Sequence, residues 1–237
     1  MDRAELERQL ARHVAAGDTA ARDAVAHVLA TTYGAAALPA LLRASVDDRN
    51  DDGESLQLTV LELVEAWPEE ALAQVLACVV APDPGLRRVG VWGLSVIDWS
   101  RRDELIPLAV DAASDPDPRV RAAAVAALSS IFGADDPRAR AVMTAGVHDP
   151  DPDVRCAAVQ GLYPWRDEVA TGLLVAAAGD ADHAVRYWTA WALSRRPGGE
   201  AALERLAADG DAEVGAAARE VMALDQRASG AWGHQGS

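Results

Sequence analysis

The side chains best suited to bind another molecule in this chain are aromatic. Trp92 and Trp191 are two of its seven tryptophans, and Tyr163 and Tyr187 are two of its three tyrosines. Tryptophan and tyrosine join a large apolar area to a polar tip, and both are enriched at binding hot spots. Whether these four side chains share one surface depends on the elements that carry them.

Residues for catalysis or metal binding are sparse. Cys78 and Cys156 form neither a zinc nor a disulfide framework. Cys156 is expected to be a small apolar filler, although neighbouring arginines could lower its pKa and make it a groove thiol. There is no glycine-rich phosphate loop, serine nucleophile elbow or Walker motif. We therefore predict no catalytic residue, no metal and no cofactor. The histidines lack metal-ligand spacing: His13, His27, His148, His183 and His234.

One stretch, Asp115–Leu128, predicts how the aromatic residues are positioned. It reads Asp-Pro-Asp-Pro-Arg-Val-Arg and then enters an alanine-rich run. Asp117 can cap a helix N-terminus, and Pro118 suits the first helical position, where no N–H is needed. Counted from Val120, positions 0, +3, +4, +7 and +8 are apolar and form one helical face. The stretch is thus a turn followed by an amphipathic helix.

The same stretch recurs along the chain. Starts at Ala81, Asp115, Asp149, Asp180 and Asp209 are separated by 34, 34, 31 and 29 residues. A fainter copy places Leu56 in the position of Val120. Repetition with a period of 20–50 residues is the signature of a solenoid. We therefore predict an all-α fold in which helical pairs stack on one another.

The pattern Asp-Pro-x-x-x-Val-Arg-x-x-Ala resembles the HEAT-like repeat family, in particular its short bacterial, lyase-type form. The resemblance covers roughly residues 34–225. It implies a right-handed, armadillo-type α-solenoid of about six helical pairs. Such repeats serve many unrelated functions, so the resemblance predicts the fold much better than the function.

The predicted organisation is a single domain over residues 1–226. Residues 1–34 form an N-terminal cap of two helices, 3–16 and 18–33, and residues 227–237 form a flexible tail. The repeats are expected at residues 35–66, 67–99, 100–134, 135–166, 167–197 and 198–226.

An Asp and an Arg four residues apart recur in four repeats, which places both on one side of the helix. The resemblance implies that they form a structural ladder between neighbouring repeats. The first repeat has Gly53 and Gln57 at these places, and the last has Asp211 and Gly215, as terminal repeats with one neighbour would. The pairs are Asp83/Arg87, Asp117/Arg121, Asp151/Arg155 and Asp182/Arg186.

In the resembling family the second helix of each pair lines the concave side. With 0, +3, +4, +7 and +8 buried, positions +2, +6 and +9 should face outward, whereas Trp188, at +3, should be buried. The aromatic residues could equally fill gaps beside the small alanines, and the sequence leaves this open. The candidate binding residues in the groove are Arg88, Trp92, Gln160, Tyr163, Tyr187 and Trp191.

The formal net charge is −15, and all 22 basic residues are arginines. A strongly acidic surface repels phosphate, so we predict no nucleic-acid partner, whereas a basic protein partner is favoured. The leading hypothesis is a non-enzymatic protein-binding scaffold or adaptor, one version being an acidic inhibitor or immunity protein. The composition favours a bacterial source.

The alternative is an enzyme or small-molecule-binding protein with an aromatic groove pocket. HEAT-like DNA glycosylases use Trp, Asp and Arg side chains, and Trp92, Asp98, Trp165, Arg166 and Trp191 could form such a set. The net charge disfavours that alternative. The deoxyhypusine hydroxylases bind iron through His-Glu pairs, which this chain lacks, and bilin lyases share the repeats without a shared motif here.

The first residues, Met1–Leu6, begin a charged amphipathic helix rather than a signal peptide. No uninterrupted apolar stretch is as long as a membrane span requires. We therefore expect a cytoplasmic protein. The oligomeric state is not predicted.

Overall fold

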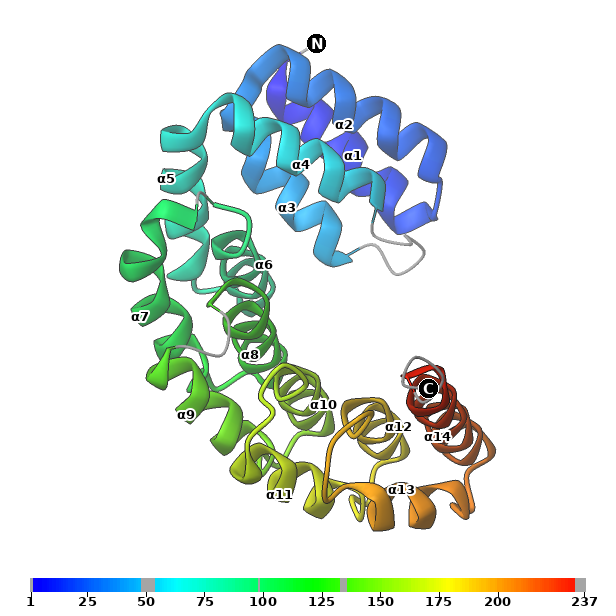
Figure 1. The fold of residues 1–237 in the computed structure, drawn as a ribbon. Coiled ribbons are helices and arrows are strands. Elements are labelled where there is room, and N and C mark those ends of the chain that lie inside the picture. Colours follow the sequence, from blue (N-terminus) through cyan, green and yellow to red (C-terminus); the bar gives the residue numbers. More distant parts are fainter. Residues whose placement is uncertain (1, 48–53, 98, 133–135, 233–237) are drawn as a thin grey trace. The chain divides into compact units, whose positions relative to one another are not determined.

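The computed structural model describes residues 2–47, 54–97, 99–132 and 136–232 (Figure 1). Within these ranges the chain is all-helical and contains no β-strand, as the repeat pattern predicts. It divides into two compact units, residues 1–127 and 128–237, and the division falls inside one helix. Each unit is described below by itself.

The N-terminal unit begins with the two predicted helices of the N-terminal cap. Gly17 ends the first helix in a left-handed conformation (φ 67°), and the Asp18 carboxylate caps the second. The helical elements of this unit are α1 (Arg3–Ala16), α2 (Thr19–Tyr33), η1 (Gly34–Ala37), α3 (Leu38–Asp47), α4 (Glu54–Ala66), α5 (Pro68–Val79), α6 (Pro84–Leu94), η2 (Trp99–Arg101), α7 (Arg102–Ala112) and the first part of α8 (Pro118–Phe132).

The C-terminal unit continues from the end of α8. Its last helix extends through Trp232, into the segment that was predicted to form a flexible tail. Residues 233–237 lie outside the described ranges. The remaining helices are α9 (Pro137–Gly146), α10 (Pro152–Gly161), α11 (Glu168–Ala177), α12 (His183–Ala192), α13 (Glu200–Ala207) and α14 (Ala212–Trp232).

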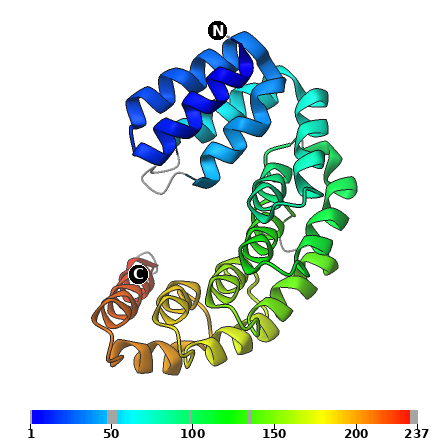
Figure 2. The same ribbon diagram turned by 180° about the vertical axis from the view of Figure 1, so that it is seen from behind.

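The C-terminal unit has two layers of helices. Each odd-numbered helix packs against the even-numbered helix that follows it, as α9 does on α10 and α13 on α14. The second helices of the pairs also pack on one another, α10 on α12 and α12 on α14. Both ribbon views show α10, α12 and α14 side by side in one layer (Figures 1 and 2). This is the helix-pair stacking expected of a solenoid.

The N-terminal unit starts with a different order. Helix α1 packs on α3 and α3 on α6, while α2 packs on α4 and α4 on α5. Helix α3, not α4, is therefore the neighbour of the second helix α6. Leu56 of α4 was predicted to be equivalent to Val120, the first buried residue of a second helix. Leu56 is buried, but this prediction is wrong because α3 and not α4 packs on the next second helix, α6. Gly53 lies outside the described residues.

The pair α5 and α6 packs closely because of glycine. A Cβ atom added to Gly90 would come within 3.0 Å of backbone atoms of Cys78 and Val79 on α5. Real Cβ atoms do not approach backbone so closely, so the two helix backbones can meet at this point only without a side chain. Gly93, one turn later, faces the side chain of Val75 in the same way.

One stretch, Thr19–Ser45, is long and apolar enough to span a membrane by length and composition, with a mean hydropathy of 1.5 over its best window. No such span was expected from the sequence. The stretch comprises α2, η1 and α3, and half of the window is buried inside the protein. Core helices of proteins without a membrane segment pass the same test.

Candidate binding surface

The repeated Asp and Arg do not pair within a repeat in the way that their i, i+4 spacing suggests. The Asp caps the helix that it precedes: Asp83 accepts the N–H of Leu86 at 2.8 Å, and Asp151 accepts that of Asp153 at 3.0 Å. Asp117 and Asp182 cap α8 and α12 in the same way. The ladder residues Asp83, Asp117, Asp151 and Asp182 are therefore helix caps.

The arginines instead pair with an aspartate of the next repeat. Arg155 binds Asp180 through two parallel hydrogen bonds of 2.8 Å, and its third nitrogen donates to the carbonyls of Asp149 and Pro150 in its own loop. Both side chains of the ion pair are mostly buried, at 16% and 13% exposure. Two further rungs have the same geometry, Arg87–Asp115 and Arg186–Asp209.

These rungs shift the titration of their members. The hydrogen bonds from Arg87 lower the pKa of Asp115, and those from Arg186 lower the pKa of Asp209. In return the carboxylates raise the pKa of Arg87, Arg155 and Arg186. A bidentate, partly desolvated pair of this kind is stronger than an exposed ion pair. The arginine thus fixes its own loop and the next one at once.

The sequence held a signal for the correct partner. The rung aspartate is the first residue of the repeated stretch, and Ala81 stands there in the repeat that follows Gln57. Conversely, Asp209 is kept in the last repeat although Gly215 replaces the arginine there. Acceptor and donor are therefore present or absent together across a repeat boundary, not within a repeat.

Arg121 makes the same loop contacts as the other arginines. Its guanidinium donates to the carbonyls of Asp115 and Pro116 at 3.1 and 3.3 Å. Its place in the motif is therefore that of Arg87 and Arg155.

Positions +2, +6 and +9 of the second helices all reach the surface, as expected. Arg88 and Trp92 on α6 and Ser95 directly after it are half-buried, whereas Gln160 on α10 is exposed, and so is Tyr163, at 48%. Tyr187 and Trp191 on α12 are half-buried. Within the C-terminal unit, the structure brings together Gln160, Tyr163, Tyr187 and Trp191. Trp92 belongs to the N-terminal unit.

The prediction for Trp188 is wrong, because its side chain is 40% exposed. The buried face of the second helices includes position +5, at Val159 and Ala190, which the pattern omitted. At 3.6 residues per turn, +3 and +5 lie on opposite flanks of the helix. The buried arc is shifted toward +5, so a side chain as large as tryptophan at +3 extends into solvent.

The result is a group of three neighbouring aromatic residues on α12, here called the α12 aromatic cluster: Tyr187, Trp188 and Trp191. The Tyr187 and Trp188 rings meet edge to face, with centroids 5.3 Å apart and planes at 88°. Trp191 follows one turn after both. On the adjacent loop, the Arg166 guanidinium lies 4.8 Å from the centre of the Tyr163 ring. This surface can bind by apolar contact and cation–π attraction.

A buried arginine, not predicted from the sequence, fixes the loop that carries Tyr163. Arg196 is 3% exposed. It donates to the carbonyls of Leu162, Tyr163, Trp165 and Ala192. Burial and the nearby Arg166 lower the Arg196 pKa. The carbonyls at the C-terminal end of α10 supply the negative partial charge that stabilises the guanidinium.

Trp165 is a packing residue. It is 4% exposed, and the guanidinium of Arg140 lies 5.3 Å from its ring centre. Arg140 in turn pairs with Asp167 at 2.6 Å. Buried Trp165 cannot contact a base, so it cannot belong to the base-binding set suggested for a glycosylase. Asp98 of that set lies outside the described residues.

Cys156 is poorly suited to act as a nucleophile. Its own burial and the carboxylates of Asp182, Asp153 and Asp180 raise the pKa of the thiol to about 11, against a small opposing effect of Arg155. The expectation that arginines could activate it is wrong. In the part of the chain that the structure describes, no cluster of His, Cys, Asp and Glu could hold a metal ion.

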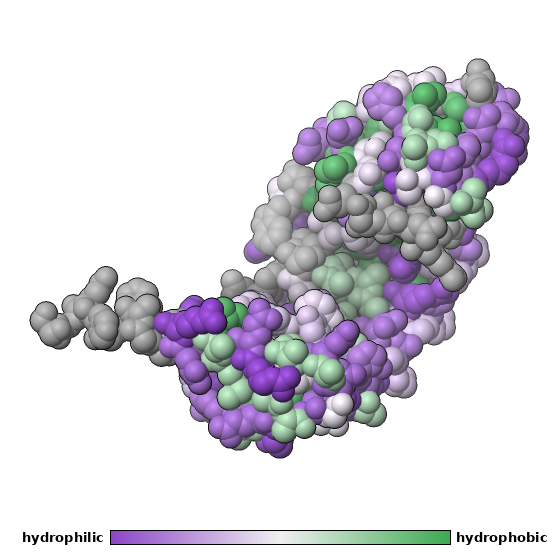
Figure 3. Space-filling model, turned by 90° about the vertical axis from the view of Figure 1, so that its right-hand side faces the viewer, coloured by the Kyte–Doolittle hydropathy of each residue, from purple (hydrophilic) through white to green (hydrophobic). Residues whose placement is uncertain are grey.

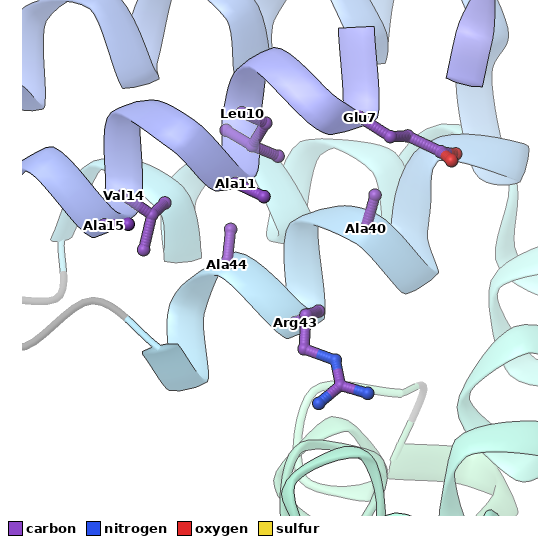
Figure 4. A pocket seen from close by; sticks show the side chains of 8 residues that line it. All are labelled: Glu7, Leu10, Ala11, Val14, Ala15, Ala40, Arg43 and Ala44. Atoms are coloured by element: carbon purple, nitrogen blue, oxygen red, sulfur yellow. The ribbon is translucent and has the colours of Figure 1, made fainter. Parts of the chain in front are cut away.

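A groove of about 310 Å³ lies between α1 and α3 in the N-terminal unit. In Figure 4, Ala11 on α1 faces Ala40 and Ala44 on α3 across the gap, and the Arg43 side chain extends away from α1. Arg43 ends in an ion pair with Asp83 of α6 at 3.0 Å. This groove could not be expected from local sequence patterns, because its two walls come from different helices.

Hydrophilic residues are spread over both parts of the surface in the space-filling view (Figure 3). This agrees with the 25% charged composition.

Comparisons with known proteins address the family directly. The family model described as HEAT repeats matches residues 69–162 and again residues 142–223. A search of curated proteins finds no match. HEAT repeats generally mediate protein–protein interactions. Since the two matches together span well over half of the chain, the protein belongs to the HEAT-repeat family.

Proposed function

We propose that this protein is a non-enzymatic scaffold that binds a partner protein on the second-helix face of its C-terminal unit. The proposed contact residues are Gln160, Tyr163 and the α12 aromatic cluster. On the N-terminal unit, Arg88 and Trp92 are proposed as contact residues for a protein partner.

The exposure of Trp188 and Tyr163 carries this proposal. Two large aromatic side chains leave 40% and 48% of their surface in solvent, next to Tyr187 and Trp191 on the same layer of helices. Buried Trp165 shows that the unit can cover a tryptophan when packing requires it. Exposed aromatic groups on a rigid helical layer are suited to become buried against another protein.

The charge of the chain supports a basic partner. At −15, the protein attracts cationic proteins and repels nucleic acids. This charge favours one form of the scaffold hypothesis, in which the protein is an acidic inhibitor or immunity protein that neutralises a basic target. We place it in the cytoplasm of a bacterium.

The experiment is affinity capture from a lysate of the source cells with wild-type protein and two variants. Trp188→Ala removes an aromatic group from the proposed surface. Trp67→Ala is the matched control, because Trp67 is also 40% exposed but belongs to the N-terminal unit. We expect one protein to be captured by wild type and by Trp67→Ala but not by Trp188→Ala, with a loss of about 2 kcal/mol or more in purified form.

Equal recovery with all three proteins would argue against the α12 aromatic cluster as a contact surface. A gel-shift assay with duplex DNA at physiological salt provides the second measurement. We expect no shift, and tight binding would favour the base-binding alternative instead.

A further inference from the structure

We propose that the α12 aromatic cluster receives a cationic side chain, arginine or lysine, of the partner protein. This inference rests on the proposed function and specifies the chemistry of that surface. It depends on three features of the C-terminal unit: the direction of its second helices, the carboxylates beside the cluster, and the places of the arginines.

The second helices α10, α12 and α14 run in the same direction. At one end, Arg155 near the start of α10 pairs with Asp180 just before α12, and Arg186 pairs likewise with Asp209 just before α14. At the other end, Arg166 after α10 donates to the carbonyl of Ser194 after α12 at 2.7 Å. Equivalent positions on the three helices are therefore neighbours on one face.

The helices on both sides of α12 present carboxylates on this face. Asp153 on α10 and Glu213 on α14 occupy the position before the first buried residue, and Glu220 on α14 is equivalent to Trp191. All three are exposed. Their carboxylates make no ion pair or hydrogen bond within the described residues, unlike the rung aspartates, so they remain available to a partner.

Arginines are placed away from these carboxylates. None of the +2, +6 and +9 positions of α10, α12 and α14 is basic. Arg219 on α14 is exposed and precedes Glu220, but its guanidinium donates to the carbonyl of Ala207 on α13. The exposed Arg166 and Arg195 follow the C-terminal ends of α10 and α12, and Arg227 lies in the last part of α14. Most of the face around the cluster is therefore negative, and its C-terminal edge is positive.

The α12 aromatic cluster adds cation–π attraction to the charge attraction of the carboxylates. Because Tyr187 and Trp188 meet edge to face, their π faces point in different directions. A guanidinium or ammonium group is attracted to such faces, most strongly to tryptophan. With Glu220 one helix away, at the typical interaxial distance of 8–10 Å, a long cationic side chain can contact a ring and approach a carboxylate together. Acidic or purely apolar partners would leave the three carboxylates uncompensated.

The test uses a nona-arginine peptide and the full-length protein. The indole N–H signals of the seven tryptophans, assigned by single Trp→Phe substitutions, locate the peptide in NMR spectra, and fluorescence anisotropy gives its affinity. The face variant is Asp153→Asn/Glu213→Gln/Glu220→Gln. The control is Glu62→Gln/Glu65→Gln/Glu204→Gln, which removes the same charge from exposed positions on α4 and α13.

We expect the peptide to shift the Trp188 and Trp191 indole signals and not that of Trp67. The face variant should weaken binding about tenfold, and the control variant should change it less than twofold. A nona-glutamate peptide should not bind.

Equal weakening by the two triple variants, or shifts spread over all indole signals, would mean that only the net charge attracts the peptide and would overturn the inference. Failure of nona-arginine at the cluster, combined with a lysate protein that Trp188→Ala fails to capture, would overturn this inference and leave the proposed function standing. If nona-arginine does not bind at the cluster and Trp188→Ala captures the same proteins as wild type, both this inference and the proposed function are overturned.

Discussion

Helices α1–α4 of the N-terminal unit and the helices of the C-terminal unit stack by different means. In the C-terminal unit, the ion pairs Arg155–Asp180 and Arg186–Asp209 link the loops that precede α10, α12 and α14. In α1–α4 of the N-terminal unit, contact is mainly apolar, and Leu38, Leu41 and Leu42 of α3 are fully buried. There α3 is linked to α6 by Arg43–Asp83, from the middle of a helix to a helix cap.

The difference shows what the repeated motif is for. An Arg–Asp rung requires the loops before two second helices to lie side by side. Helix α6 packs on α3, which follows η1 rather than an Asp-Pro loop, so no rung can form there. Gln57 and Ala81 stand where the motif would need Arg and Asp. The Arg–Asp motif is therefore present where the second helices of two consecutive repeats pack on each other, and it is absent where α6 packs on α3 instead.

Arg196→Ala should give the largest effect and would break the C-terminal unit specifically. The change leaves three carbonyls at the end of α10 without their buried donor. At about 1–3 kcal/mol for each unsatisfied buried group, partly relieved by water, we expect a loss of about 4 kcal/mol. Chemical denaturation measures it.

Arg195→Ala is the control for this change, because Arg195 is exposed and adjacent. It should cost less than about 0.5 kcal/mol. If Arg195→Ala and Arg196→Ala lower the free energy of unfolding by similar amounts, the contacts of Arg196 with the carbonyls are not the cause of the loss.

Gly90→Ala tests the close helix pair of the N-terminal unit. The new methyl group would meet backbone of α5, which can yield only by separating the helices, so we expect a loss of about 3 kcal/mol. Gly161→Ala is the counterpart in the C-terminal unit. Its Cβ would meet the end of the Met143 side chain, which can turn away, so about 1 kcal/mol is expected. Thermal melts of both variants compare them, and the reverse order would contradict this account.

Arg186→Ala tests the rungs directly. It removes a bidentate, mostly buried ion pair and two loop contacts, for an expected loss of about 2 kcal/mol. The control Arg138→Ala removes a local pair with Asp136 in which the arginine side chain is 46% exposed. It should cost well under about 1 kcal/mol. Equal denaturation midpoints would mean that the rungs contribute nothing.

The rungs should also make stability depend on pH. Since Arg186 lowers the Asp209 pKa in the folded state, the ionised carboxylate stabilises the fold above the unfolded pKa of about 3.9. That stabilisation disappears as pH falls through the lower folded pKa. The stability difference between wild type and Asp209→Asn should thus be largest near pH 7 and shrink below about pH 4. Denaturation at several pH values measures it, and a difference that grows in acid would contradict the assignment.

Trp188→Ala should cost little stability, about 1 kcal/mol, since its side chain is 40% exposed. Trp165→Ala, at 4% exposure, should cost about 3–5 kcal/mol. Melting temperatures of the two variants compare them. A large loss for Trp188→Ala would make that residue a packing group and weaken the proposed function.

The sequence by itself determined the repeated elements. Its Asp-Pro caps, its apolar periodicity and its period near 34 residues predicted helices such as α8, α10 and α12, because capping and amphipathicity are local properties of the chain. Local pattern also showed that Trp191 and Gln160 face outward. The two N-terminal helices were predicted close to their observed bounds for the same reason.

Only the tertiary structure decided which residues meet across repeats. The partner of Arg155 is 25 residues away, and other aspartates such as Asp151 lie much nearer in the sequence, so local pairing pointed to the helix cap instead. The exposure of Trp188 depends on how far the buried arc of α12 is rotated, which its neighbours α10 and α14 set. The burial of Arg196 requires carbonyls from a loop more than 30 residues earlier. The neighbour of α6 is α3 because packing, unlike capping, is decided by helices far apart in the chain.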